Sequence, residues 1–484
     1  MKLLDRTTSW VLTILTRQAH AWLMARSSFA SSDEIFEYLL TFVNVEKGQK
    51  TEFKLDRMIF LASLLGNPQA GRLTIHVAGS KGKGSVSTMC ANILHAAGLR
   101  VGLYTSPHLL RWKERIALAG KEMSERTLIR AMEEVLPLIE GKRADFYPGE
   151  ELPTYFELTT LVAFCAFRAI ECSAQVIETG LGGRLDSTNI VDPDVSVITP
   201  IELEHTQFLG DTISKIAFEK AGIIKQGKPV CIAIQKPEAR EVFESKAEAM
   251  GSRLYRLGSD IYFDKISIDV KGTSCRLFSQ GELLPAAGLE VHCPMIGSIQ
   301  AQNMALAALA TTCVLQRSGT GDVREAGYAA IRKGLAGSSL PARFEVAGKN
   351  PAIVLDGAHT PESVHLAMDT MTALFPGPKV LLFACAYDKR HAEMAAILAP
   401  YFKAIIVTKP GNFKVSDPLA VFGSFAALRP DCGFEEDTRA AIEQAISEAA
   451  ACDGALLVTG SFYLCAEAKA LLATRGSEGS GSRL

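Results

Sequence analysis

The stretch that most constrains the fold is residues 73–84, which read LTIHVAGSKGKG. A short apolar run with β-branched residues stops at a glycine-rich loop, and the next segment, SVSTMCANILHAAG, repeats apolar residues at helical spacing. We therefore predict a strand, a glycine loop and a helix, in that order. The backbone N–H groups of such a loop and the N-terminus of the helix form a site for phosphate, and a lysine adds positive charge.

The loop departs from the general P-loop pattern G-x-x-x-x-G-K-[ST] at two positions. Val77 occupies the place of the first glycine, and Gly84 stands where a Ser or Thr hydroxyl would follow Lys83. The local sequence therefore leaves two interpretations open. One is a nucleotide phosphate site, and the other is an ordinary glycine-rich turn of an α/β protein.

Length and composition indicate a globular protein of two or three domains. The 484 residues exceed what one hydrophobic core usually organises. Lys and Arg number 51 and Asp and Glu 53, a net charge of −2, so neither nucleic acid nor a membrane surface is expected as a partner. The 11 cysteines are scattered without a C-x-x-C motif, which is typical of buried, reduced thiols in a cytoplasmic protein.

Residues 1–30 are expected to form an N-terminal extension, either helical or disordered. Their apolar run, WVLTILTRQAHAWLMA, is interrupted by polar residues and fits neither a signal peptide nor a membrane span. Met24 is an alternative start of the chain. Since no uninterrupted apolar run of about 18 residues occurs elsewhere, we predict no transmembrane segment.

Further strands are expected to end in polar or glycine-rich sequence. They cover residues 99–104, 174–177 and 195–198, and are followed by TSPH, by ETGLGGR and by IELEHTQFLGDT. In open α/β sheets ligands bind at the carboxyl ends of parallel strands, so these segments should lie near the glycine loop. Helices are expected at 31–43, with Ser32 or Asp33 as N-cap, and at 55–65, 125–139, 154–170, 213–221 and from about 301.

A second α/β region is expected after a junction rich in Gly, Ser and Pro. The junction, residues 335–345, reads LAGSSLPARFE. Beyond it, short apolar strands alternate with helical segments, which predicts a second, smaller parallel sheet. Its strands are expected at 352–355, 380–383, 404–407 and 455–458, and residues 476–484, GSEGSGSRL, are expected to be a disordered tail.

Eight motifs make the chain similar to one family. They are HVAGSKGKGS, LYTSPHLLRWKERI, TYFE, ETGLGGRLDSTNIVDPDV, EHTQFLGDT, EKAGIIK, PARFE and DGAH, and the resemblance covers roughly residues 56–461. In this order they resemble the folylpolyglutamate synthase and dihydrofolate synthase family of the Mur ligase superfamily. The resemblance implies an α/β fold, with a P-loop-containing, Mur-ligase-like central ATPase domain over residues 31–335 and a smaller Rossmann-like α/β C-terminal domain over 336–475.

The resemblance also implies an ATP- and Mg-dependent ligase that adds L-glutamate to a folate or dihydropteroate carboxylate. The γ-phosphate of ATP would pass to the carboxylate, and the amine of glutamate would then displace phosphate from the acyl phosphate. The substrates would be small molecules, and we expect a cytoplasmic monomer without nucleic-acid or membrane partners.

Two other functions remain open. A Mur-type ligase could join an amino acid to a cell-wall precursor, although the TYFE and LYTSPHL motifs argue against it. A nucleotide-binding homologue without ligase activity is disfavoured because Lys83, Glu178, His205 and Lys220 are all present.

By resemblance, the nucleotide would contact both domains. Lys83 and the amides of Gly82 and Gly84 would hold the β- and γ-phosphates, and Gly79 and Ser85 complete the loop. In the second domain the matching positions for adenine, phosphate and ribose are Asn303, Arg343, Asp356 and His359.

The resemblance implies two magnesium ions next to the phosphates, with oxygen ligands suited to a hard cation. Their ligands would be Ser106, Glu178 and His205, with a carbamylated Lys220 as an anionic donor. Lys83, His205, Lys220 and Arg343 would be the catalytic groups, because phosphoryl transfer depends on positioning and charge neutralisation. The alternative is that Lys220 is an unmodified lysine on a helix surface.

Four residues match positions that contact the pterin-bearing substrate: Thr154, Phe156, Arg184 and Asp186. Phe156 could stack on a pterin ring, and Asp186 could accept hydrogen bonds from its N–H groups. The alternative is that TYFE only begins a core helix.

The chain departs from the family pattern at three places. Ser80-Lys81 replaces the usual Thr-Asn in the loop, Glu204 replaces an Asp, and Trp112-Lys113 replaces an aromatic-Asn pair. The chemical character is broadly kept at each place, but the second lysine of the loop, Lys81, has no explanation in the sequence.

Overall fold

The computed structural model describes residues 28–43, 54–317, 323–411 and 415–480. Two compact units divide the chain. Unit 1 contains the described residues up to Lys83 and residues Gly98–Leu254, and unit 2 contains Gly84–Ala97 and the described residues from Tyr255 onward. The division therefore cuts the glycine loop from the helix behind it, whereas the sequence suggested a boundary at 335–345.

The large sheet has the strand order β4-β3-β2-β5-β1-β6-β7-β8. Its centre is parallel, with β1 between β5 and β6. The strands β2 and β7 are also parallel to their inner neighbours, while β3 and β4 are antiparallel. The strands are β1 (Leu73–Ala78), β2 (Val101–Tyr104), β3 (Ile116–Leu118), β4 (Lys121–Glu122), β5 (Ala174–Glu178), β6 (Val195–Ile198), β7 (Val230–Ile232) and β8 (Leu254–Arg256).

Two apolar cores cover one face of this sheet. Register places Tyr104 opposite Ile177, and Ala78 opposite Ile198, so that residues paired in this way share a face. The first pair belongs to a core with α2 (Ser32–Leu39), α3 (Asp56–Leu64), α5 (Glu125–Val135) and α6 (Tyr155–Ala169). The second pair belongs to a core with α8 (Ile213–Ala221) and α9 (Pro237–Ala249).

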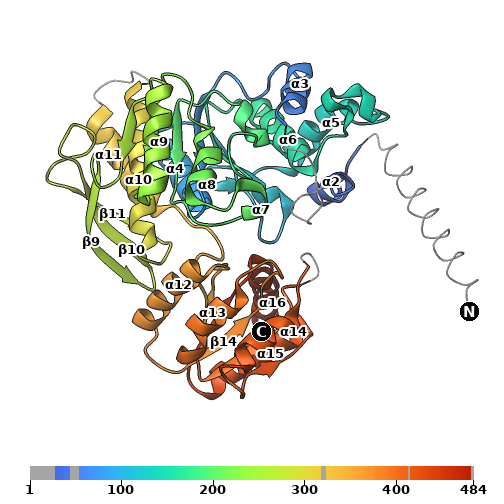
Figure 1. Ribbon diagram of the computed structural model, residues 1–484, viewed down its shortest axis with the longest axis vertical. Helices are drawn as coiled ribbons and strands as arrows, with labels where there is room; N and C mark the ends of the chain where they lie inside the picture. Colours follow the sequence, from blue (N-terminus) through green and yellow to red (C-terminus); the bar gives the residue numbers. More distant parts are fainter. Residues whose placement is uncertain (1–27, 44–53, 318–322, 412–414, 481–484) are drawn as a thin grey trace, which may run out of the picture. The chain divides into compact units, whose positions relative to one another are not determined.

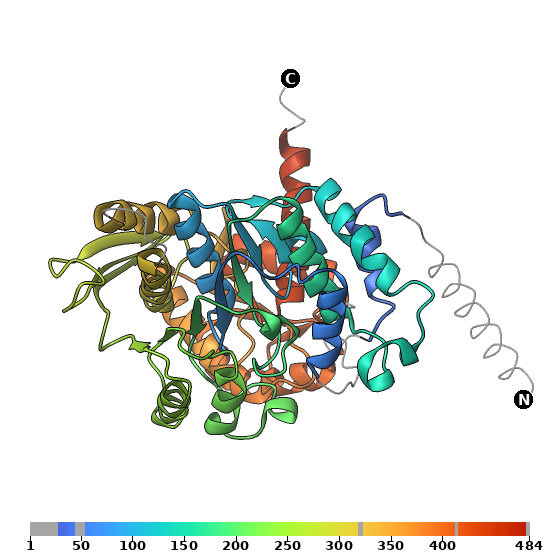
Figure 2. The same cartoon turned by 90° about the horizontal axis from the view of Figure 1, so that it is seen from above.

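Unit 2 contains α4 (Lys83–Ala96), whose sequence follows the glycine loop, from Gly84 onward. The amide of Asn92 donates to the Ser338 hydroxyl at 3.1 Å, and a Cβ atom at Gly334 would lie 2.4 Å from the Cα of Ile93. Only a glycine allows this approach. The helices α10 (Ile299–Arg317) and α11 (Val323–Ala336) lie along a three-stranded antiparallel sheet of β9 (Tyr262–Asp269), β10 (Gly272–Phe278) and β11 (Leu289–Cys293) (Figures 1 and 2).

The second sheet has the order β12-β13-β17-β14-β15-β16. The four expected strands are parallel, as predicted, and the sheet adds β12, which is antiparallel to β13, and β16, which is parallel to β15. Its strands are β12 (Glu345–Lys349), β13 (Ala352–Leu355), β14 (Lys379–Phe383), β15 (Ala404–Val407), β16 (Gly433–Phe434) and β17 (Ala455–Thr459). Its helices are α12 (Pro361–Leu374), α13 (His391–Leu398), α14 (Pro418–Ala426), α15 (Thr438–Ala451) and α16 (Phe462–Ser480).

The start of α2 and the end of α16 differ from the bounds expected from the sequence. The N-cap of α2 is Ser31, whose hydroxyl accepts a hydrogen bond from the Glu34 amide at 3.2 Å, not Ser32 or Asp33. Helix α16 continues to Ser480, because adding a residue to an existing helix costs less than starting one. The expected tail from residue 476 is therefore helical to 480, and residues 481–484, like 1–27 of the expected N-terminal extension, lie outside the described residues.

All 11 cysteines are described, and each is a free thiol, as expected. Most are buried, so they contribute to packing. Among the described residues, no helix combines the length and apolar character needed to cross a bilayer.

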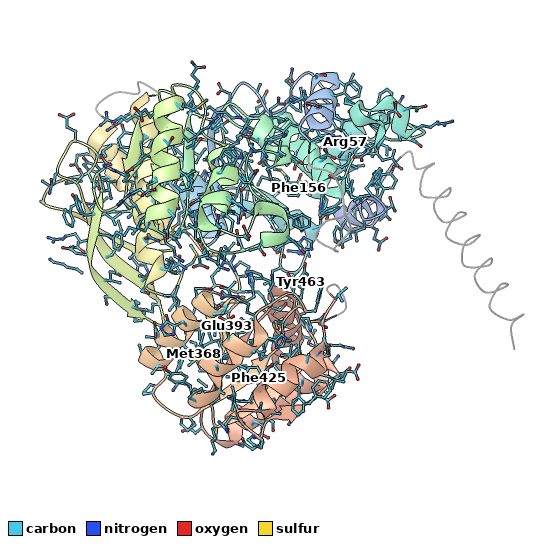
Figure 3. All side chains as sticks on the ribbon, in the orientation of Figure 1. Arg57, Phe156, Met368, Glu393, Phe425 and Tyr463 are labelled. Carbon is cyan, nitrogen blue, oxygen red and sulfur yellow. The ribbon has the colours of Figure 1, made fainter. Side chains whose placement is uncertain are left out.

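A buried ion pair joins α3 to α6. Arg57 and Glu157 are both almost fully buried, and the Arg57 Nε atom lies 3.0 Å from Glu157 Oε2. Figure 3 labels Arg57 on this part of unit 1. The same carboxylate accepts from the backbone N–H and the hydroxyl of Thr154 at 2.7 and 2.9 Å, so it closes the capping box of α6.

We predict that Arg57→Met lowers the free energy of unfolding by about 3–5 kcal/mol, because Glu157 then stays buried without its cation. Urea denaturation followed by circular dichroism measures the change. Lys215→Met is the control, since it breaks the exposed pair of Lys215 with Asp211 and should leave the unfolding curve unchanged. Equal stability of the two variants would contradict the prediction.

Candidate active site

The glycine loop makes a close turn against the end of β6. Gly79 has a φ of +142°, and a Cβ atom there would lie 1.8 Å from Thr199 Oγ1. Gly82 has a φ of +85°. The amides of Ser80 and Lys81 donate to the Pro200 carbonyl at 3.0 and 3.3 Å. These contacts explain why the loop needs glycine at 79, and they fasten it to the segment after β6.

Two lysines donate to the same carbonyl oxygen of this loop. The Lys83 Nζ atom lies 3.0 Å from Gly79 O, and the Lys220 Nζ atom lies 2.8 Å from it. Lys220 also donates to Glu204 Oε1 at 3.0 Å and is 1 % exposed. Lys220 is therefore not a lysine on a helix surface, and its expected role as a carbamylated metal ligand stays a prediction.

Burial and charge act on this cluster in opposite directions. Burial lowers the pKa of Lys220 to about 8, against the opposing charge of Glu204. Burial alone would raise the pKa of Glu204, but Lys220, Lys83, His205 and Lys81 outweigh it and hold this pKa far below its usual range. Glu204 is thus the ionised counter-charge of the cluster. The charge of Lys81 acts on the same carboxylate, which places this unexplained lysine beside the site.

Of the expected metal ligands, the structure joins Ser106 and Glu178. Glu178 ends β5 and is buried, and its Oε2 atom accepts a hydrogen bond from the Ser106 amide at 3.0 Å. His205 is exposed and is the N-cap of α7 (Thr206–Leu209), with a φ of +47°. The described residues contain no group of three or more His, Cys, Asp and Glu side chains arranged to hold a metal ion.

The loop that carries Ser106 is held by the segment behind it. The Glu114 carboxylate accepts from the amides of Leu109, Leu110 and Arg111 at 2.7 to 3.3 Å. Trp112 packs in the core of unit 1, and Lys113 pairs with Glu122 and Glu125 at 3.0 and 3.1 Å. The Trp112-Lys113 departure therefore serves the packing of this loop.

The expected substrate residues divide between the start of α6 and the second glycine loop. Thr154 is the N-cap of α6, so one interpretation of TYFE, the start of a core helix, is correct. Phe156, labelled in Figure 3, also contacts the second glycine loop. A Cβ at Gly180 would lie 2.4 Å from its ring. Its ring lies 6.0 Å from that of Tyr104 between centroids.

Arg184 and Asp186 have different surroundings. Arg184 is exposed and donates to the Glu219 carboxylate, with the closest contact at 2.9 Å. Asp186 is buried and accepts from the amides of Leu181 and Thr188 at 2.8 and 3.0 Å. Burial raises the pKa of Asp186, and these donors oppose that rise.

Four expected nucleotide residues lie in unit 2. The Arg343 guanidinium lies 4.3 Å from the ring centroid of Phe462, and the His359 ring meets the same ring edge-on at 5.9 Å. Asp356 accepts from the amides of Phe344 and Ala358 at 2.7 and 2.8 Å. On α10, the Asn303 amide donates to Gln300 at 2.9 Å, and its buried Oδ1 atom has no partner among the described residues. Gly84 and Ser85 lie buried in the first turn of α4.

Two features of the site were missed from the sequence. Thr199 fills the space beside Gly79, and Glu219 pairs with Arg184. Thr199 could have been found, because it directly follows β6 at the carboxyl edge of the sheet. The neighbour of Lys220 on α8, Glu219, carried no such signal.

Family comparisons assign the class of protein. The chain matches the Mur ligase middle domain over residues 77–311 and the Mur ligase glutamate ligase domain over residues 342–462. The fold and the site therefore define an α/β Mur ligase, as the eight motifs predicted.

Individual relatives define the family. Folylpolyglutamate synthase of Lacticaseibacillus casei is 34% identical over 86% of this chain and 94% of that protein. The structure of the Mycobacterium tuberculosis folylpolyglutamate synthase complexed with ADP has a TM-score of 0.81 at 29% identity, covering 92% of this chain and 98% of that one. For E. coli FolC in complex with DHPP and ADP the TM-score is 0.78 at 27% identity, with coverage of 92% and 99%. The chain belongs to the folylpolyglutamate synthase and dihydrofolate synthase family of the Mur ligases.

We predict that Gly79→Ala weakens ATP binding at least tenfold and lowers stability, because the new Cβ meets Thr199 in a backbone region almost restricted to glycine. Calorimetric titration with ATP measures the binding. Gly71→Ala is the matched control, since Gly71 has a φ of +81° with no atom within 4 Å of the new Cβ. It should cost about 1 kcal/mol of stability and leave ATP binding unchanged. A Gly79→Ala protein that binds ATP like the wild type would refute this role of the turn.

Proposed function

We propose that the protein is an ATP-dependent ligase that adds L-glutamate to a folate or dihydropteroate carboxylate. The observation that most supports this proposal is the joint donation of Lys83 and Lys220 to the Gly79 carbonyl in a glycine loop at the carboxyl edge of the sheet. In this proposal the two cations neutralise the charge of a bound triphosphate. Relatives of the same family are named folylpolyglutamate synthase and dihydrofolate synthase, and two of their structures contain ADP.

In this proposal, the residues of the chain bind and orient the reactants. The amides of Gly82 and Gly84 and the Lys83 ammonium hold the β- and γ-phosphates of ATP. The γ-phosphate passes to the substrate carboxylate, and the glutamate amine then displaces phosphate from that carbon to form an amide. Arg343 neutralises charge on the transferred phosphate, and Asn303, Asp356 and His359 contact the adenosine.

The Glu178 carboxylate and the Ser106 hydroxyl are oxygen donors of the kind that magnesium prefers, and the ion when bound would neutralise the phosphates. Glu178 is a buried carboxylate within hydrogen-bond distance of the Ser106 amide, so this loop brings oxygen donors to the end of β5. We propose that Ser106, Glu178 and His205 hold one ion and that Lys220, as a carbamate, helps to hold a second.

Carbamylation of Lys220 is supported by its surroundings. The reaction requires the neutral amine: its nitrogen forms a bond to the carbon of carbon dioxide and loses a proton, which leaves one negative charge. Burial lowers the pKa of Lys220 to about 8, so the neutral amine is far more populated at neutral pH than for an exposed lysine.

Phe156, Arg184, Asp186 and Thr154 are proposed to contact the pterin-bearing substrate, with the Phe156 ring against the pterin. The relative that was solved with DHPP supports a substrate of this kind. We further propose that the chain is a cytoplasmic monomer whose partners are small molecules. Light scattering of the purified protein tests the monomer.

We predict that purified protein with ATP, magnesium and glutamate releases ADP when dihydropteroate or tetrahydrofolate is added. A coupled assay for ADP measures this release. Release of ADP with a muramyl precursor alone would instead indicate a cell-wall ligase. Release with none of the three substrates would exclude ligase activity on them.

We predict that Lys83→Met reduces turnover by about 100-fold or more. Its unfolding temperature should match the wild type, and full activity would contradict the role of Lys83.

We predict that Lys220→Ala also loses activity and that a small carboxylate such as acetate restores part of it, because acetate can replace the missing carbamate. The ADP assay with and without acetate measures the rescue. Lys215→Ala, an exposed lysine on the same helix, is the matched control and should keep full activity without acetate. Full activity of Lys220→Ala would exclude its role, and a loss that acetate does not restore would exclude the carbamate.

A further inference from the structure

A buried histidine lies at the centre of the sheet face that carries the two apolar cores. His76 is in β1, opposite Ile177 of β5 and Ser196 of β6, and its side chain has no exposed surface. Because Ala78 of the same strand belongs to one core and Ile177 to the other, His76 lies between them. Most fully buried positions of a central parallel strand are apolar, so a polar side chain here needs a reason.

A chain of hydrogen bonds runs from His76 to the second glycine loop. The His76 Nε2 atom lies 2.8 Å from the hydroxyl of Thr188, in the 3₁₀ helix η6 (Ser187–Ile190). The hydroxyl of Thr188 donates to Asp186 Oδ1 at 2.5 Å. The other oxygen of Asp186 accepts from the Leu181 amide at 2.8 Å. The imidazole is thus two hydrogen bonds away from the Asp186 carboxylate of the expected substrate site, and three away from the Leu181 amide.

The donors in this chain can be assigned. Burial, and then the charge of Lys225, lowers the pKa of His76 to about 3, so the ring is neutral and carries one N–H. The Thr188 hydroxyl has a single hydrogen, which it gives to the Asp186 carboxylate, so His76 donates from Nε2. Its Nδ1 atom is then an acceptor, and it has no partner among the described residues. An unpaired acceptor costs less than an unpaired buried N–H.

The same segment is attached to the helix that carries Lys220. The Arg184 amide donates to the Glu219 carbonyl at 2.7 Å, and the Asn189 side chain donates to the Gly222 carbonyl at 3.1 Å. A Cβ at Gly183 would lie 2.9 Å from the Glu219 carbonyl oxygen. These contacts hold both ends of the segment 183–189. Within it, the Leu181 and Thr188 amides and the Thr188 hydroxyl hold the Asp186 carboxylate, and His76 contacts the hydroxyl among these donors.

We propose that His76 is a positioning residue for the pterin-bearing substrate. It fixes the Thr188 hydroxyl, and this hydroxyl holds the Asp186 carboxylate in the orientation that accepts N–H donors from the pterin ring. The inference rests on the proposed function, since Asp186 is expected to contact that substrate. Because hydrogen bonds in a buried chain polarise one another, the Nε2–H of His76 also strengthens the bond from Thr188 to Asp186.

The test compares His76→Leu with His76→Gln. The Gln side chain places an amide N–H near the position of Nε2, whereas Leu fills the space without a donor. We expect His76→Leu to weaken dihydropteroate binding about tenfold, measured from pterin fluorescence without ATP, with the KM for ATP unchanged. His76→Gln should bind within about twofold of the wild type. A purely structural role of His76 would not weaken dihydropteroate binding while leaving the KM for ATP unchanged.

A second pair of variants keeps the test decisive if His76→Leu does not fold. Thr188→Val removes the hydroxyl at constant shape and should weaken dihydropteroate binding like His76→Leu, while Thr188→Ser should retain binding. Thr159→Val is the matched control, because the buried Thr159 hydroxyl has no partner among the described residues. Its loss should change neither the affinity for dihydropteroate nor the KM for ATP.

The outcomes separate this inference from the proposed function. A wild-type protein that binds neither dihydropteroate nor tetrahydrofolate and releases ADP with neither refutes the proposed function itself. Wild-type binding together with unchanged affinity in His76→Leu and Thr188→Val refutes only the role of His76. Equal losses of affinity for dihydropteroate and for ATP would show that the chain of hydrogen bonds only stabilises the fold. This result would overturn the proposal.

Discussion

The hydrogen bonds from Lys83 and Lys220 to one carbonyl oxygen depend on a backbone turn that few residues can make. Gly79 reaches a φ of +142°, and Thr199 occupies the space where a side chain would be. Burying an ammonium group is costly unless an opposite charge accompanies it, and Glu204 supplies that charge to Lys220. The loop, the end of β6 and helix α8 therefore act as one assembly, and each of the three requires the other two.

One face of the large sheet carries both the apolar cores and two buried polar side chains. Its strands contribute apolar side chains to two cores on one face, and the polar side chains His76 and Ser196 lie opposite each other between those cores. The Ser196 hydroxyl donates to the Ile223 carbonyl at 2.7 Å, and His76 contacts Thr188. Ser196 thus attaches the segment after α8, and His76 attaches the segment after β5.

Local sequence patterns predicted the bounds of an element well where the apolar periodicity ended at polar residues. Strand β6 and helix α8 have the bounds expected from the sequence, because apolar alternation or helical spacing ends there at polar residues. Errors occurred where neighbouring signals competed. Ser31, Ser32 and Asp33 can all cap a helix, and tertiary packing around Ser32, whose hydroxyl donates to Glu125, selects Ser31. The antiparallel direction of β12 depends on its pairing with β13, which no local pattern encodes.

The sequence by itself determined the order of strand, loop and helix and, through eight motifs, the family, and it predicted which residues hold phosphate and metal. Only the tertiary structure decided which of those residues meet. Lys220 reaches Gly79 across 141 residues, and His76 reaches Thr188 across 112. Such contacts follow from strand register and from the packing of α8 and η6 on the sheet, whereas periodicity reports only which face of an element is buried. Glu204 illustrates the difference: in the sequence it is a substituted acid, and in the fold it is the counter-charge of Lys220.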